Sequence, residues 1–205
     1  MFKKLKLMKK LFPANNPAKI RSYGKMDTKF LKSFLAQLQN SFSQEREPDG
    51  LILLIDSQGG EKIILDNVLC QIERLGLPCM GVVENQAFSC GAELLLACQY
   101  RIANLHANFV FHHGQYLMQG QDFLDYETLE YIVRSEVTRQ NAMMKRFARI
   151  TGQGIKTARA VYRSNIAIPA ERALELGVIH EITEGSLSVD DDKFEPVFIS
   201  QPPAK

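Results

Sequence analysis

The chain has 205 residues, of which 45% are hydrophobic and 23% charged, and its formal net charge is +2. This is the composition of an ordinary globular domain and excludes a wholly disordered or collagen-like chain. The small net charge argues against a nucleic-acid partner. No apolar run reaches the roughly 18 residues that a stable membrane span requires.

The two ends of the chain differ from its middle. The first 12 residues, "MFKKLKLMKKLF", interleave five lysines with large apolar residues. They predict a disordered basic arm over residues 1–18, with a membrane-surface helix as the alternative. Residues 184–205 include "VDDDKFEP" and predict an acidic, solvated tail. The folded domain is expected over residues 19–183.

Helical and strand patterns alternate through the first half of this domain. Residues 27–42 place phenylalanines at helical spacing, and "EREPDG" ends that pattern. The apolar run at 51–55 predicts a buried strand, and "DSQGG" predicts a turn after it. Residues 61–75 predict a second helix, which Gly76 ends.

The second half continues the alternation. Residues 79–83 predict another buried strand, "NQAFSCG" a loop, and residues 92–98 a helix that is apolar on all sides. Further strands are expected at 100–103, 108–112 and 178–182, and further helices at 125–150, 158–162 and 170–176. The alternation predicts an α/β layered domain with a largely parallel sheet, in which sites form at the carboxyl ends of the strands.

The four cysteines, Cys70, Cys79, Cys90 and Cys98, stand among apolar residues and show no CxxC spacing. We interpret them as buried, reduced thiols, which are typical of a cytoplasmic protein. Without paired histidines or metal-ligand spacing, they predict neither a metal site nor a cofactor.

Ser89 stands at the predicted strand-to-helix junction, where a serine is either a helix cap or a nucleophile. The N–H groups at a helix start can hold the oxyanion that forms when a hydroxyl attacks a carbonyl, and Cys90 would supply one of them. A nucleophile also needs a base. His112 and His113 end the run "NFVF", and because neighbours on a strand face opposite sides, at most one of them can serve Ser89.

Five segments resemble the ClpP family, the proteolytic subunits of Clp proteases, and together they extend over roughly residues 20–182. "LIDSQGG" is similar to the family's "NSPGG", "NQAFSCGA" to "GQAASMGA", and "NFVFHH" to "RVMIHQ". "ITGQGIKTARAVYRSN" resembles the segment that begins "HTGQ", and "AERALELGVIHEI" resembles "APEAVEYGLVDSI". The resemblance implies the ββα spiral of the ClpP/crotonase superfamily, with a protruding helix or handle region.

The resemblance also implies a serine endopeptidase. Its implied site residues are Ser89 as nucleophile, His112 as base, Gly60, Glu61 and Cys90 in the oxyanion hole, and Asn165 where the family has an aspartate. An asparagine carbonyl can orient a histidine but cannot neutralise its charge. An Asp-to-Asn change in a serine triad can cost about 10⁴ in rate.

The partners that the resemblance implies are a peptide or protein substrate and further copies of the chain in a ring. Tyr116, Leu117 and Met118 form an apolar cluster just before the long helix, which favours such an assembly. The N-terminus has no recognisable axial-loop segment, and this argues against docking to an ATP-dependent unfoldase.

Two alternatives stay open. The segment "LPCMGVVENQAFSCGAELLLACQYRIANLHANF" is also similar to enoyl-CoA hydratases of the crotonase family. Glu93 matches the first of their two acid/base glutamates, but His113 stands at the second. The chain is therefore a ClpP-like peptidase, an acyl-CoA enzyme, or a ClpP-like scaffold without activity.

Overall fold

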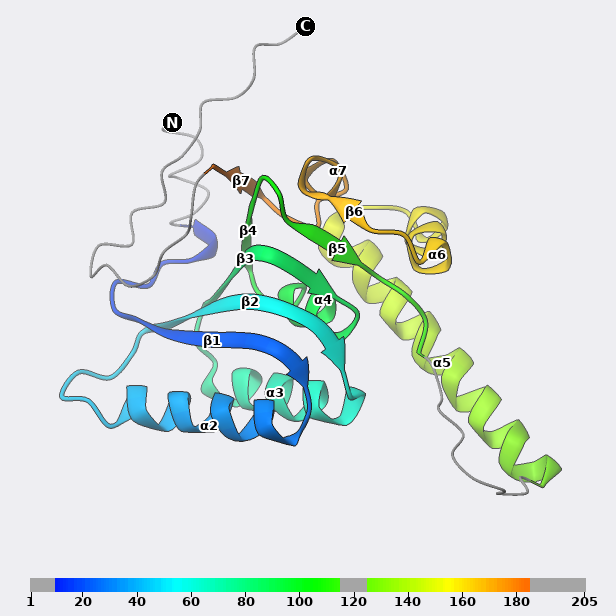
Figure 1. Ribbon diagram of the computed structural model, residues 1–205, viewed down its shortest axis with the longest axis horizontal. Helices are drawn as coiled ribbons and strands as arrows, with labels where there is room; N and C mark the ends of the chain where they lie inside the picture. The colour runs from blue at the N-terminus through cyan, green and yellow to red at the C-terminus, as the bar shows by residue number, and fades with distance from the viewer. Residues whose placement is uncertain (1–9, 115–124, 185–205) are drawn as a thin grey trace, which may run out of the picture. The chain divides into compact units, whose positions relative to one another are not determined.

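The computed structural model describes residues 10–114 and 125–184 (Figure 1). The chain divides into two compact units. The first unit holds the chain up to Val110 and from Ala167 onward, and the second holds Phe111–Ile166. The expected arm, domain and tail boundaries at residues 18 and 184 stay a prediction.

A mostly parallel, seven-stranded sheet forms the centre of the first unit, and it confirms the predicted α/β class. The strand order is β1-β2-β3-β4-β7, while β5 pairs with β3 and with β6. The strands are β1 (Pro17–Met26), β2 (Gly50–Gly60), β3 (Cys79–Phe88), β4 (Tyr100–Asn104), β5 (Asn108–Val110), β6 (Ile168–Pro169) and β7 (Glu181–Thr183). Every pairing is parallel except that of β5 with β6.

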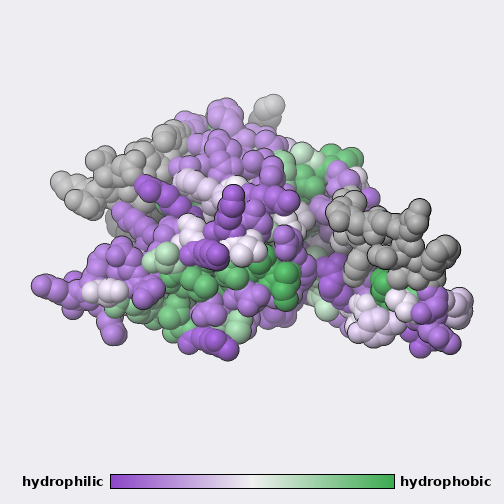
Figure 2. Space-filling view, turned by 60° about the horizontal axis from the view of Figure 1, so that its bottom comes forward, coloured by the Kyte–Doolittle hydropathy of each residue, from purple (hydrophilic) through white to green (hydrophobic). Residues whose placement is uncertain are grey.

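Among the described residues, this unit contains the helices α2 (Thr28–Phe42), α3 (Lys62–Leu75), α4 (Cys90–Leu95) and α7 (Ala170–Glu175). The Asp27 carboxylate accepts hydrogen bonds from the main-chain N–H groups of Lys29 and Phe30 and so caps the start of α2. Figure 1 shows α2 and α3 on the same side of the sheet. Their apolar stripes are buried, namely Phe30, Phe34 and Leu38 on α2 and Ile64, Val68 and Ile72 on α3. Outside these stripes, Leu35 and Ile63 are exposed, and Figure 2 shows hydrophobic patches among hydrophilic surface.

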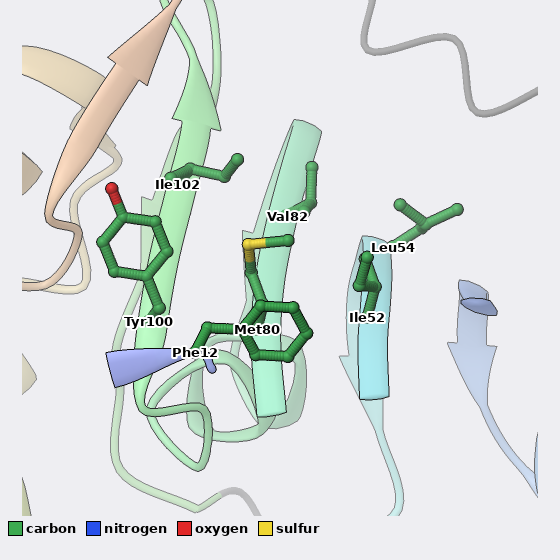
Figure 3. Packing of buried hydrophobic residues seen from close by; sticks show 7 residues of the cluster. All are labelled: Phe12, Ile52, Leu54, Met80, Val82, Tyr100 and Ile102. Atoms are coloured by element: carbon green, nitrogen blue, oxygen red, sulfur yellow. The ribbon is translucent and has the colours of Figure 1, made fainter. Parts of the chain in front are cut away.

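The opposite face of the sheet is covered by the N-terminal segment. Phe12 is 5% exposed and packs on alternate residues of three strands (Figure 3). These residues are Ile52 and Leu54 of β2, Met80 and Val82 of β3, and Tyr100 and Ile102 of β4. The main-chain N–H groups of Asn15 and Asn16 donate to the Asp49 carboxylate at 2.8 and 2.6 Å, which fixes the path into β1. Burial of Phe12 on the sheet thus places this part of the expected arm against the first unit.

The first three strands, β1, β2 and β3, differ from the sequence prediction. β1 was missed because its exposed positions are polar, although Ala18, Ile20 and Ser22 alternate on the buried side. "DSQGG" is not a free turn, since β2 continues to Gly60, which pairs with Met26 of β1 beyond an irregularity. "NQAFSCG" is not a loop throughout, since β3 continues to Phe88 and pairs with β5.

The cysteines are free, but they are not all buried as predicted. Cys70 is exposed, because it lies two positions from Val68 and from Ile72 and so projects away from the buried stripe of α3. Cys79, Cys90 and Cys98 are buried, and the sulfur atoms of Cys79 and Cys98 are 3.2 Å apart.

A buried polar cluster attaches the C-terminal segment to β4. The Arg101 guanidinium donates to the carbonyl oxygens of Cys98, Gly177 and Val178 at 2.6 to 3.0 Å. The His180 ring stacks on Tyr100 and its Nδ1 accepts from the Arg101 main-chain N–H. Burial, with the Arg101 charge adding to it, lowers the pKa of His180 to about 4.

The described part of the second unit contains the helices α5 (Tyr126–Thr151) and α6 (Ile155–Ser164). Phe111 lies edge-on against Phe147 of α5, with ring centroids 5.1 Å apart. Both rings also contact Tyr162 of α6. The apolar residues of α5 are only partly buried. Met144 and Phe147 are buried in its second half, whereas Leu129, Val133 and Val137 are exposed in its first half.

Candidate functional site

Ser89 lies between β3 and α4, with backbone angles of φ 52° and ψ −119°. A positive φ is strained for a serine, and its occurrence at a strand-to-helix turn is typical of a serine whose hydroxyl is presented for attack. The side chain is half-buried and makes no capping hydrogen bond to α4. Of the two roles considered for Ser89, the cap is therefore not formed in this structure.

The main chain of Ser89 is held on both sides. Its N–H donates to the carbonyl oxygen of Val110, the last residue of β5, at 2.7 Å, and its own carbonyl accepts from the N–H of Glu93. No sequence motif indicates the Val110 contact, because the contact depends on the pairing of β3 with β5.

Gly59 and Gly60 bring the end of β2 against this turn. A β-carbon on Gly59 would lie 2.6 Å from the β-carbon of Ser89 and 3.1 Å from the nitrogen of Cys90. A β-carbon on Gly60 would lie 2.4 Å from the Met26 carbonyl oxygen. Both glycines have positive φ, 89° and 151°. Only glycine meets both requirements here, the close approach and the backbone conformation.

The expected oxyanion-hole residues lie together in the first unit, but they are not equivalent. Cys90 begins α4, where a helix has N–H groups without intrahelical partners. The N–H of Glu61 donates to the Met26 carbonyl oxygen at 2.8 Å, so it is engaged within the sheet edge. The carbonyl oxygen of Gly60 accepts from the Cys90 thiol at 3.3 Å, which brings the Gly60–Glu61 peptide beside the start of α4.

Cys90 is unsuited to be a nucleophile itself. Burial raises the pKa of its thiol above the ordinary value, so the sulfur stays protonated at neutral pH. The other candidate at this turn is the Ser89 hydroxyl, and its expected role as the nucleophile stays a prediction.

His112 and His113 lie in the second unit, beyond the end of β5 at Val110. The strand predicted over 108–112 is thus shorter, and the expectation that the two rings point to opposite strand faces does not apply. The Nδ1 atom of His112 is 2.6 Å from the carbonyl oxygen of His113. Because a carbonyl oxygen can only accept, this contact assigns the proton to Nδ1 and leaves the Nε2 lone pair free in the neutral ring.

Asn165 also lies in the second unit, at the end of α6. Its φ of 49° is left-handed, a conformation that asparagine tolerates better than most residues. The side chain is exposed. Among residues 10–114 and 125–184, no hydrogen bond joins Asn165 to His112. The structure thus shows a helix-ending role for Asn165, and its expected place in a triad stays a prediction.

A family model described as Clp protease matches residues 5–186 of the chain. The chain belongs to the Clp protease family. No curated protein matches it. Membership of the Clp protease family favours peptidase chemistry over the acyl-CoA alternative, for which Glu93 and His113 had been considered.

Two further findings concern the part of the chain that the structure describes. None of its helices has the length and apolar character needed to cross a membrane. No group of three or more histidine, cysteine, aspartate or glutamate side chains within it is arranged to hold a metal ion. The apolar cluster Tyr116–Met118 lies outside the described residues.

Proposed function

We propose that this member of the Clp protease family is a serine endopeptidase. Ser89 is its nucleophile, His112 its general base, and the N–H groups of Cys90 and Gly60 its oxyanion donors. Glu61, the other expected donor, contributes once its N–H is released from Met26. The family relationship, the strained turn at Ser89 and the glycines packed against it support this assignment.

One observation carries the proposal. The N–H of Ser89 donates to the carbonyl oxygen of Val110, and His112 follows Val110 by two residues. Two extended residues cover at most about 7 Å. Covalent geometry therefore limits how far the His112 backbone can lie from the residue to which Ser89 is bonded, whatever the orientation of the second unit.

The reaction follows from these groups. Nε2 of His112 takes the proton from the Ser89 hydroxyl as its oxygen attacks the peptide carbonyl, and the oxyanion is held by main-chain N–H groups. The protonated ring then gives that proton to the leaving amine, which leaves an acyl ester on Ser89. Water, deprotonated by the same ring, hydrolyses the ester and restores the serine. The resemblance assigns the third position to Asn165, and the mechanism requires that some acceptor hold the Nδ1 proton.

We further propose a peptide or protein substrate and a homo-oligomeric ring. The first half of α5 supports the ring, because Leu129, Val133 and Val137 recur every four residues and are 43%, 59% and 51% exposed. Exposed apolar stripes of this kind usually lie in interfaces. A cytoplasmic location stays a prediction, as does the argument from the N-terminus against docking to an ATP-dependent unfoldase.

Labelling with a fluorophosphonate probe tests the proposal, since such probes form a covalent bond with an activated serine. We expect labelling of the wild-type protein on Ser89 and hydrolysis of small fluorogenic peptides. Ser89→Ala should lose both, while Ser135→Ala, at an exposed serine of α5, should lose neither. A folded protein that is neither labelled nor active would instead indicate a scaffold without activity.

A further inference from the structure

We infer that the main-chain carbonyl of His113, and not the side chain of Asn165, holds His112 in the tautomer and orientation of a general base. We also infer that the His113 ring is a positioning group, because its packing fixes that carbonyl. The inference rests on the proposed function in one respect, the role of His112 as the base.

The hydrogen bond itself is short and unambiguous in direction. Nδ1 of His112 and the carbonyl oxygen of His113 are 2.6 Å apart, and only the ring nitrogen can donate. In serine peptidases the third group accepts from Nδ1, so that Nε2 is free to take the serine proton. A carbonyl oxygen can supply this acceptor in place of a carboxylate, but it carries no negative charge.

The residues on either side of His112 are anchored to one aromatic ring. Phe111 is 1% exposed, and its ring centroid lies 5.6 Å from that of Tyr162. His113 stacks on the same Tyr162 ring at 5.9 Å with an interplanar angle of 28°. Tyr162 is buried and packs in turn against Phe147 of α5. We name Phe111, His113, Phe147 and Tyr162 the aromatic clamp.

The aromatic clamp explains an otherwise unfavourable feature of His113. Its Nδ1 atom is buried and has no hydrogen-bond partner among the described residues, an arrangement that needs a structural explanation. Burial lowers the pKa of His113, so the ring stacks on Tyr162 in its neutral form. A neutral ring acts here as an apolar, flat group, and phenylalanine can reproduce that property.

The helix-ending role of Asn165 is sufficient to explain an asparagine at this position. It ends α6 with a left-handed backbone, and its side chain is exposed. Glycine preserves that conformation and removes the amide altogether. Asn165→Gly is therefore a matched test of whether the amide contributes anything to His112.

The experiment combines peptide hydrolysis with ¹⁵N NMR of histidine-labelled protein, in which His112→Gln identifies the His112 signals. In the wild-type protein we expect His112 to carry its proton on Nδ1. Asn165→Gly should leave this tautomer and kcat unchanged. His113→Ala should release the ring, mix the tautomers and lower kcat by about tenfold or more. His113→Phe should restore the wild-type behaviour, because it keeps the stacking on Tyr162.

The NMR result decides the inference whether or not peptides are cleaved. An Nε2-protonated His112 in the wild-type protein would overturn it, as would loss of the Nδ1 tautomer in Asn165→Gly. If folded His113→Phe and His113→Ala show the same His112 tautomer and the same kcat, the His113 ring does not position His112. Failure of the proposed function would give a different result. The probe would not label Ser89, although the His112 tautomer would be as expected.

Discussion

The α-carbon of Gly59 faces Ser89 so closely that a single methyl group cannot be placed between them. A β-carbon at Gly59 would lie 2.6 Å from that of Ser89 and 2.7 Å from the Phe88 carbonyl oxygen. The backbones at the end of β2 and the start of α4 are therefore in direct contact, with no side chain between them.

Gly59→Ala should abolish probe labelling of Ser89 and lower the free energy of unfolding, because the methyl group must displace the Ser89 turn. Gly76→Ala is the matched control. Gly76 also has positive φ, 63°, but a β-carbon there meets no atom within 4 Å. The control should show only the backbone cost of about 1 kcal/mol and normal labelling. Normal labelling in Gly59→Ala would mean that the turn does not position Ser89.

Phe12→Ala should lower the free energy of unfolding by about 3 kcal/mol, because it removes a buried ring from the sheet and leaves a cavity. Urea denaturation followed by circular dichroism measures the change. Lys10→Ala, at an exposed residue of the same segment, should have little effect. An equal, small effect of both substitutions would show that the segment does not stay on the sheet in solution.

The free energy of unfolding should fall as the pH is lowered from 6.5 toward 4, in part through His180. The unfolded chain takes up a proton on this ring near pH 6.5, whereas burial in the folded chain lowers the pKa to about 4. Protonation thus favours the unfolded state throughout this interval. His180→Gln cannot take up this proton, so its stability should depend less steeply on pH. Identical pH dependence of the two proteins would contradict the assignment to His180.

Light scattering should give a mass above that of the 23.2 kDa chain, since the exposed stripe on α5 is expected to be covered by further copies. Val133→Lys together with Val137→Lys places two charges in that stripe and should reduce the mass. Ser135→Lys adds a charge on another side of α5 and should not. A wild-type protein of one-chain mass would rule out the assembly.

The sequence predicted the elements whose pattern is local. The phenylalanine stripe of α2, the Gly76 end of α3 and the buried run of β2 are where periodicity and glycine placed them. β1 was missed, because its exposed side is polar and its pairing partner, β2, is distant in the sequence. Strand ends were misjudged for the same reason, since pairing with a neighbour extends β2 and β3 beyond their apolar runs.

In the candidate site, too, the local motifs were predictable and the contacts between distant residues were not. Ser89 and the glycine pair were recognisable as motifs, whereas the Val110 acceptor depends on strand pairing that no motif records. The contact between His112 and the His113 carbonyl depends on main-chain geometry, to which side-chain identity gives no guide. Phe12 lies in the segment expected to form a basic arm because lysines dominate the composition there, and its burial depends on strands that are distant in the sequence.

The antiparallel pairing of β5 with β6 would allow residues 111–166 to be replaced. Phe109 pairs with Ile168, so the chain leaves the first unit and returns to it on adjacent strands. Residues 111–166 thus form an insertion whose two ends are already side by side. A short hairpin could close the gap, and a foreign segment of different length could take the place of the insertion, without any change in the order of the sheet.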